Sequence, residues 1–218
     1  MDIEASKIPN VQLVKTGSKK NPGYTVEGWI DLHAWTGYYL YDDSYKLKKD
    51  KVVTNGSIRL SFDSTGDLAQ EQVDCYYYLV EHEETIKRSI LQALKQAFPR
   101  LLSTEYESWD HDDGSLPRLA DLTPAFDFKN HIGPETISIG EIDKDGMAYV
   151  TWYFRAAWDP EHGMQVITHK DRVIDIGPET DIWNIYKDKG TYEQELEDYN
   201  KRVWTKVPPK KKKWWQFW

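Results

Sequence analysis

The chain has 218 residues, 39% of them hydrophobic and 14% aromatic, which suits a folded domain and excludes a disordered chain. The net charge is −8, and it becomes −8 − 4 = −12 for residues 1–209 when the lysines 210–213 are left out. An acidic body repels nucleic acid and anionic lipid. We therefore expect a basic protein partner and no nucleic acid.

The sequence also indicates a reducing compartment. Cys75 is the only cysteine, so no internal disulfide can form, which is typical of a cytoplasmic protein. Residues 1–4 show no basic segment followed by an apolar run, so we expect no signal peptide. No stretch reaches the roughly 18 consecutive apolar residues that would span a membrane. We predict a cytoplasmic location.

The first part of the chain predicts an arm followed by three strands. Residues 1–23 are polar and predict a flexible N-terminal arm. Aromatic and β-branched residues are frequent over 24–41, which predicts a hairpin that turns at Thr36 and Gly37. A further strand over 57–62 follows Asn55-Gly56, a strong turn dipeptide.

Two helices are predicted next. Residues 68–80 form the first, with Asp67 as the capping residue. The second begins near Glu83, and Pro99 is expected to end it. Its apolar residues recur every four positions and predict one buried stripe. The stripe consists of Ile86, Ile90, Leu94 and Phe98.

The C-terminal half predicts a four-stranded antiparallel meander. Its strands are 136–142, 148–158, 164–169 and 172–176. Asp145-Gly146 forms the first turn, and Asp159–Gly163 forms the second. Trp152 lies in the middle of the apolar face of strand 148–158. A short helix that Thr191 caps follows the meander.

These elements predict an α+β fold. An antiparallel sheet, made of the hairpin and the C-terminal meander, is covered on one face by one or two helices. The predicted organisation is an N-terminal arm over 1–23, a single domain over 24–205 and a basic, aromatic tail over 206–218.

Two stretches carry a family resemblance. One is the run 72–79, Gln-Val-Asp-Cys-Tyr-Tyr-Tyr-Leu, which leads into the second helix. The other is 148–177, with Trp-Asp-Pro-Glu-His-Gly at 158–163. Residues 24–183 resemble an uncharacterised bacterial domain family, common in gut Bacteroidota and Firmicutes, whose members carry a Trp-Asp-x-Glu-His-Gly turn. The resemblance implies no activity and no functional residue. Small proteins of this kind often look like immunity partners of secreted toxins.

Asp159, Glu161 and His162 are the best candidates for a site. A carboxylate beside an imidazole can carry out acid–base chemistry near neutral pH. The alternative is structural: Asp159 caps the turn, and Gly163 adopts an unusual backbone angle. The acidic loop that contains Trp109, Asp110 and Asp112 is a second candidate, as a landing surface for a basic partner or as a solvated loop.

The histidines do not predict a metal site. His162 and His169 are seven positions apart on one predicted strand, which places them on opposite faces and about 23 Å from each other. His82-Glu83 begins like the zinc-protease signature, but Ile86 stands where the second histidine is required. Phosphate-binding and dinucleotide-binding glycine motifs are missing from the sequence, so we expect no cofactor.

The tail combines cations with aromatic rings. These residues are Lys210, Lys211, Lys212, Lys213, Trp214, Trp215, Phe217 and Trp218. Lysines attract anionic surfaces, and Trp prefers the boundary between lipid and water. Three uses remain open: packing on the protein itself, docking into a partner, or peripheral contact with a membrane.

Two functions of different classes follow. The first is a non-catalytic cytoplasmic binding protein, with toxin neutralisation as a specific version. The second is a small hydrolase-like enzyme whose site is the Asp159–His162 turn. The sequence favours the first, because no nucleophile lies near this turn in the sequence.

Overall fold

A computed structural model describes residues 8–17, 22–42, 51–64, 66–104 and 126–205. The chain divides into two compact units, residues 1–180 and 181–218. The boundary between them falls inside the segment 24–205 that was predicted as a single domain.

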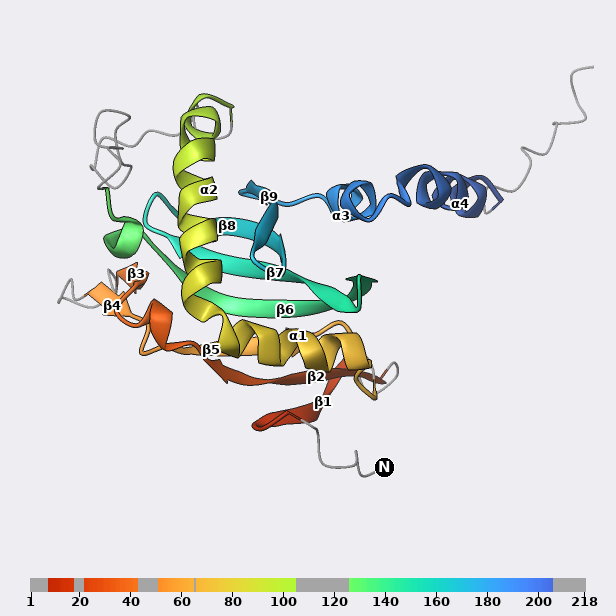
Figure 1. Cartoon of the computed structure of the whole chain (residues 1–218), viewed down its shortest axis with the longest axis horizontal. Coiled ribbons are helices and arrows are strands. Elements are labelled where there is room, and N and C mark those ends of the chain that lie inside the picture. Colours follow the sequence, from red (N-terminus) through yellow and green to blue (C-terminus); the bar gives the residue numbers. More distant parts are fainter. Residues whose placement is uncertain (1–7, 18–21, 43–50, 65, 105–125, 206–218) are drawn as a thin grey trace, which may run out of the picture. The chain divides into compact units, whose positions relative to one another are not determined.

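A seven-stranded sheet forms the framework of the first unit, in the order β1-β2-β5-β6-β7-β8-β9 (Figure 1). Its strands are β1 (Val11–Gly17), β2 (Pro22–Asp31), β5 (Ser57–Phe62), β6 (Ile132–Lys144), β7 (Met147–Ala156), β8 (Asp159–His169) and β9 (Arg172–Gly177). All neighbours are antiparallel except β5 and β6, which are parallel. The helices between β5 and β6 provide the long crossover that a parallel pair requires.

The fold is therefore mixed, with a sheet that is mostly antiparallel and helices against it, as predicted. The β6–β9 meander is confirmed, and Asp145-Gly146 forms its first turn with positive φ at both residues. The sheet is larger than a hairpin plus a meander. Residues 11–17, predicted as part of a flexible arm, form β1 and pair with β2 along its length.

The predicted hairpin over residues 24–41 is wrong. β2 ends at Asp31, and a 3-10 helix, η1 (His33–Trp35), leads the chain into β3 (Tyr39–Asp42). β3 pairs with β4 (Lys51–Val53) in a separate two-stranded sheet, while β2 pairs with β1 and β5. The 3-10 turn buries Trp35 completely, and this burial outweighs the local preference for a strand.

Helices α1 (Gln70–Glu81) and α2 (Glu83–Thr104) lie over one face of the sheet (Figure 1). The predicted stripe of α2 is confirmed, since Ile86, Ile90, Leu94 and Phe98 are all fully buried. Pro99 does not end α2, which continues for five more residues. The buried Leu101 holds the last turns against the core, so packing outweighs the hydrogen bond that proline cannot make.

Helix α1 begins at Gln70, and its capping residue is not the predicted one. Ala69, and not Asp67, is the residue at the cap, and its backbone N–H donates to Gln72 Oε1 at 3.1 Å. Gln72 is buried, and its Nε2 donates to the carbonyl of Gly140 at 3.2 Å. This amide therefore joins the start of the helix to β6.

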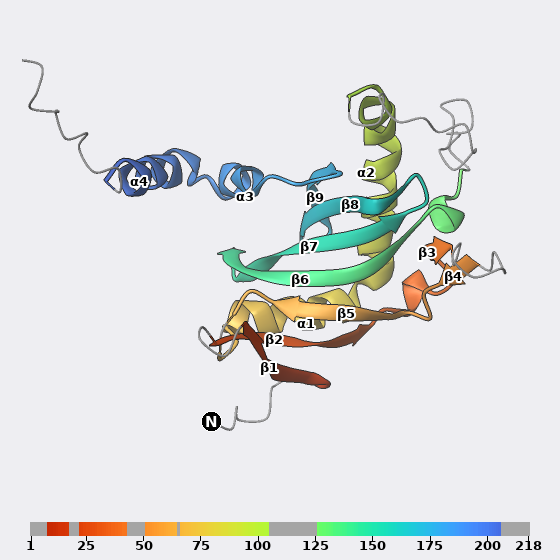
Figure 2. The same ribbon diagram turned by 180° about the vertical axis from the view of Figure 1, so that it is seen from behind.

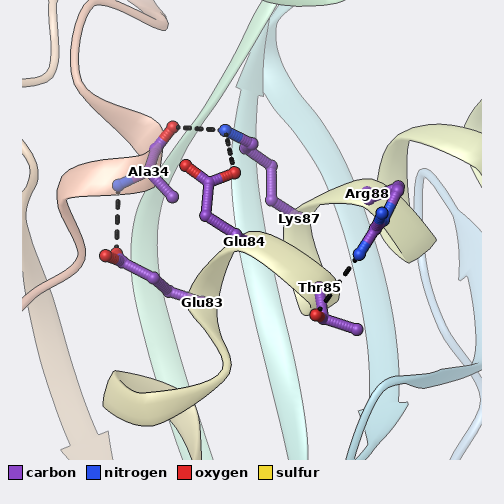
Figure 3. Close-up of polar contacts among 6 residues, drawn as sticks. All are labelled: Ala34, Glu83, Glu84, Thr85, Lys87 and Arg88. Carbon is purple, nitrogen blue, oxygen red and sulfur yellow. Dashed lines mark hydrogen bonds and ion pairs between the residues drawn. The ribbon is translucent and has the colours of Figure 1, made fainter.

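The start of α2 is attached to η1 by a set of polar contacts (Figure 3). The N–H of Ala34 donates to Glu83 Oε2 at 3.0 Å, and Lys87 Nζ donates to the Ala34 carbonyl at 3.0 Å. Lys87 also pairs with Glu84 at 2.8 Å. These contacts fix one end of α2, and the helix then carries Arg100, near its other end, toward β9.

The two faces of the sheet differ in what covers them. The covered face contains Trp152 and Phe154 of β7, and Trp35 packs on both with ring centroids 6.0 and 5.4 Å away. Seen from behind, the sheet has no helix from the described part of the first unit over its other face (Figure 2). We call this second face the open face. One row of aligned residues crosses it: Trp29, Arg59, Thr136, Tyr153 and Gln165.

The second unit contains two helices, α3 (Ile182–Lys189) and α4 (Tyr192–Thr205). Asp181 caps α3 by accepting the N–H of Trp183 at 3.0 Å, and Gly190 ends it in the left-handed conformation, with φ 84°. The helix predicted after Thr191 is α4, whereas α3 was not predicted. Trp183 connects the two helices, because its ring centroid lies 5.7 Å from that of Tyr199.

Candidate functional site

Asp159 and His162 lie at the start of β8, where the strand bulges. Ala156 pairs with Asp159, and the next pair is Phe154 with Met164. Residues 160–163 of β8 therefore stand opposite Arg155 alone. The prediction that β7 and β8 are antiparallel neighbours is confirmed, but residues 159–163 are not the turn that joins them. The turn is Ala157-Trp158, and Trp158 is buried.

Gly163 explains why this sequence forms a bulge. Its φ is +71°, and an added Cβ would lie 2.2 Å from the carbonyl oxygen of Phe154. A side chain at this position would have to push the two strands apart. The unusual backbone angle predicted for Gly163 is confirmed, and the bulge returns β8 to its pairing at Met164.

Asp159 holds the bulge from the inside. Its side chain is 1% exposed, and Oδ1 accepts the backbone N–H of His162 at 2.8 Å. The same oxygen lies 3.2 Å from Nδ1 of the His162 ring, whose side chain is 66% exposed. The other oxygen, Oδ2, is buried and has no hydrogen-bond partner among the described residues.

A pocket of about 310 Å³ opens at this bulge. It is lined by Arg100, Asp159, His162, Asp175, Ile176, Gly177, Pro178 and Glu179. Arg100 reaches it from α2 and donates to the carbonyl of Ile176 at 3.2 Å. The Ile176 N–H in turn donates to Asp175 Oδ1 at 2.9 Å. The pocket thus joins the end of α2, the start of β8 and the end of β9.

Sequence reasoning found Asp159 and His162 but missed Arg100, Asp175 and Glu179. A signal was present for the last of these. The run Ile-Gly-Pro-Glu-Thr occurs at 132–136 and again at 176–180, and the second copy contributes four residues to the pocket lining. The first copy starts β6 instead, so the pattern by itself did not distinguish a site from a strand.

The side chains of the other predicted site residues are outside the described part of the chain. The side chain of Glu161 is outside the described residues, as are Trp109, Asp110 and Asp112. The tail residues 210–218 are also outside the described part of the chain. Their roles as a landing surface, and as a contact with a partner or membrane, stay predictions.

The lining of the pocket is rich in charged side chains. Asp159 orients the His162 imidazole as a carboxylate does in acid–base catalysis. The described lining contains neither a hydroxyl nor a thiol side chain that this imidazole could activate. Cys75 lies against the Ala148 carbonyl, 3.6 Å from its Sγ, and burial raises the pKa of its thiol to about 12. A thiol with such a pKa stays protonated at neutral pH and is a poor nucleophile.

The histidines of β8 lie in different surroundings. His169 is 2% exposed, with Nε2 2.9 Å from the carbonyl of Lys144 and its ring packed on Tyr149. His162 lies in the bulge and lines the pocket. Within the described ranges, no group of three or more His, Cys, Asp or Glu side chains is arranged to hold a metal ion.

Comparison with protein families matches residues 35–183 to a family described as Domain of unknown function (DUF6985). The chain belongs to this family. The matched segment runs from η1 to the start of α3 and includes every residue that lines the pocket. The predicted resemblance to an uncharacterised domain family is therefore confirmed.

Two further comparisons add no relative. Neither the curated proteins nor the solved structures gave a match to the chain. Among the described residues, no helix combines the length and the apolar character needed to cross a membrane.

Proposed function

We propose that this DUF6985 member is a non-catalytic binding protein of the bacterial cytoplasm that takes up a basic protein partner. The specific role we propose is that of an immunity protein, which neutralises a toxin by binding it. The pocket at the β8 bulge is its binding site.

One observation carries the proposal: Asp159 lines the pocket, and its buried oxygen Oδ2 has no hydrogen-bond partner among the described residues. An unsatisfied buried acceptor costs about 1–3 kcal/mol, so a partner that brings a donor recovers this free energy on binding. Asp175 and Glu179 add negative charge around the same opening. The acidic body attracts a basic partner over longer distances.

The charges of the pocket lining also favour a basic partner. The described lining contains three carboxylates, Asp159, Asp175 and Glu179, beside the guanidinium of Arg100 and the imidazole of His162. A cationic group entering the pocket improves this balance, whereas an anionic substrate worsens it. This supports binding of a basic surface over hydrolysis of an anionic substrate such as a phosphate ester.

The experiment uses the gene that lies next to the gene of this protein on the chromosome. Its product is expressed in a bacterial host with and without the protein, and growth and co-purification are measured. We expect the neighbouring protein to arrest growth, and we expect the arrest to be relieved by the wild-type chain but not by Asp159→Asn. A neighbour that is harmless, or whose toxicity the chain does not change, would contradict the immunity role.

The second candidate is a hydrolase-like enzyme, favoured by the contact between Asp159 Oδ1 and His162 Nδ1 at 3.2 Å. In this arrangement Nε2 would act as a general base toward water. The check is hydrolysis of p-nitrophenyl acetate and p-nitrophenyl phosphate by the wild type and by His162→Asn. The binding proposal expects equal rates from both proteins. Turnover that is lost in His162→Asn and kept in an Asp171→Asn control would establish the enzyme.

A further inference from the structure

We infer that the pocket holds the guanidinium group of one arginine side chain from the partner, with Asp159 as its anchor. The inference rests on the proposed binding function and adds the chemical identity of the group that enters the site. It follows from the carboxylates of the described lining, from the oxygen of Asp159 that has no partner among the described residues, and from the size of the pocket.

The number of acceptors favours a ligand with several N–H donors. Among the described residues, Oδ2 of Asp159 has no donor, and Asp175 and Glu179 line the same pocket. A guanidinium carries five N–H donors in a fixed planar fork and forms paired hydrogen bonds with a carboxylate. An ammonium is a compact point charge and lacks this fork, so it engages fewer of these acceptors at once.

The size of the pocket agrees with this choice. A space of about 310 Å³ exceeds what an ammonium group alone would fill. A guanidinium with the end of its aliphatic stem fills more of it, and the lining residues Ile176 and Pro178 offer apolar surface for the stem.

His162 controls access to the anchor. Asp159 is 1% exposed, and Nδ1 of the His162 ring lies 3.2 Å from its Oδ1. A guanidinium that takes both oxygens of Asp159 replaces this ring contact. The His162 side chain is 66% exposed, so its ring has room to turn outward into solvent. His162 therefore acts as a cover that the arginine displaces.

The experiment titrates the full chain with N-acetyl-L-arginine amide and, separately, with N-acetyl-L-lysine amide, monitored by NMR of the protein amides. We expect saturable shifts at residues 159–163 and 175–179, with the arginine derivative binding more tightly. Asp159→Asn should weaken this binding by at least about tenfold, because it removes the charge at the anchor. Glu141→Gln, an exposed carboxylate of β6 outside the lining, serves as the matched control and should bind like the wild type.

Two further variants keep the test informative if Asp159→Asn fails to fold. Glu179→Gln changes an exposed residue of the lining and should weaken binding about two- to fivefold. His162→Ala removes the cover and should leave the affinity unchanged or increase it. Equal binding of the arginine and lysine derivatives, no saturable binding, or unaltered affinity in folded Asp159→Asn would each overturn the inference.

Failure of this inference is separable from failure of the proposed function. Relief of growth arrest without arginine binding would leave the immunity role in place and reject the arginine pocket. Arginine binding that depends on Asp159, together with a neighbouring protein that the chain does not affect, would support the pocket and reject the immunity role.

Discussion

Trp152 and Tyr153 are neighbours in β7, yet they have opposite environments. Trp152 on the covered face is fully buried, and its Nε1 donates to Thr168 Oγ1 at 2.9 Å. Tyr153 on the open face is 39% exposed, and Trp29, in the same row, is 56% exposed. Aromatic content therefore does not indicate burial in this protein. Strand alternation places these two neighbours on opposite faces, and the packing at each position decides how much of the ring is buried.

The largest effect on stability is expected from the removal of the Trp152 side chain. We expect Trp152→Ala to lower the free energy of unfolding by about 3–5 kcal/mol, because it leaves a cavity against Trp35 and deprives the buried Thr168 of a partner. Urea denaturation followed by circular dichroism measures the loss. Thermal denaturation provides the check: a melting temperature within a degree or two of the wild-type value would show that the covered face is not the core.

A second prediction concerns the edge of the covered face, at the bulge. Gly163→Ala should cost about 1–3 kcal/mol, because it adds a Cβ against the Phe154 carbonyl at a positive φ. Gly146→Ala is the matched control, since Gly146 has a similar φ of +70° but open space around it. The difference between the two variants isolates the steric part. Equal losses would show that β7 and β8 separate easily at this point.

The open face should respond much less. We expect Tyr153→Ala to change the free energy of unfolding by less than about 1 kcal/mol, because this residue is 39% exposed and lies on the open face. The variant serves as the partner of Trp152→Ala, one residue away on the same strand. A loss as large as that of Trp152→Ala would mean that another part of the protein covers this face in solution.

The smallest effect is expected from an ion pair on the open face. Arg59 Nη2 lies 2.8 Å from Glu27 Oε2, and the two side chains are 57% and 23% exposed. A double-mutant cycle with Arg59→Gln and Glu27→Gln should give a coupling of about 0.2–1 kcal/mol, which high salt reduces. A coupling well above this range, unchanged in high salt, would identify the open face as a desolvated surface.

Local sequence patterns correctly predicted the elements whose signals lie between residues close together in the sequence. The β6–β9 meander was predicted from alternation and from turn chemistry at Asp145-Gly146, and the α2 stripe from its four-residue spacing. Both signals act over a few residues and need no distant partner. The same kind of reasoning failed over residues 24–41, where β2 and β3 separate into different sheets around the buried Trp35.

The sequence predicted only part of the candidate site. Asp159, His162 and Gly163 follow one another closely, and their residue types carry recognisable turn and acid–base chemistry. Arg100 comes from a helix 59 positions before Asp159, and Asp175 and Glu179 come from the end of the next strand and beyond it. Nothing in the local sequence of Arg100 marks it, because an arginine near a helix end is ordinarily a solvated residue.

The sequence by itself determined the acidic charge, the mixed fold class, the meander, the buried face of α2 and the glycine that the β8 bulge requires. Tertiary structure decided which strands join the sheet, why α2 continues past Pro99, and which residues surround Asp159. The physical reason is range: propensity, periodicity and turn chemistry act between close neighbours, whereas strand order and pocket lining follow from burial between segments far apart in the chain. The unsatisfied oxygen of Asp159 belongs to this second kind, since only the packing of α2, β8 and β9 defines what lies around it.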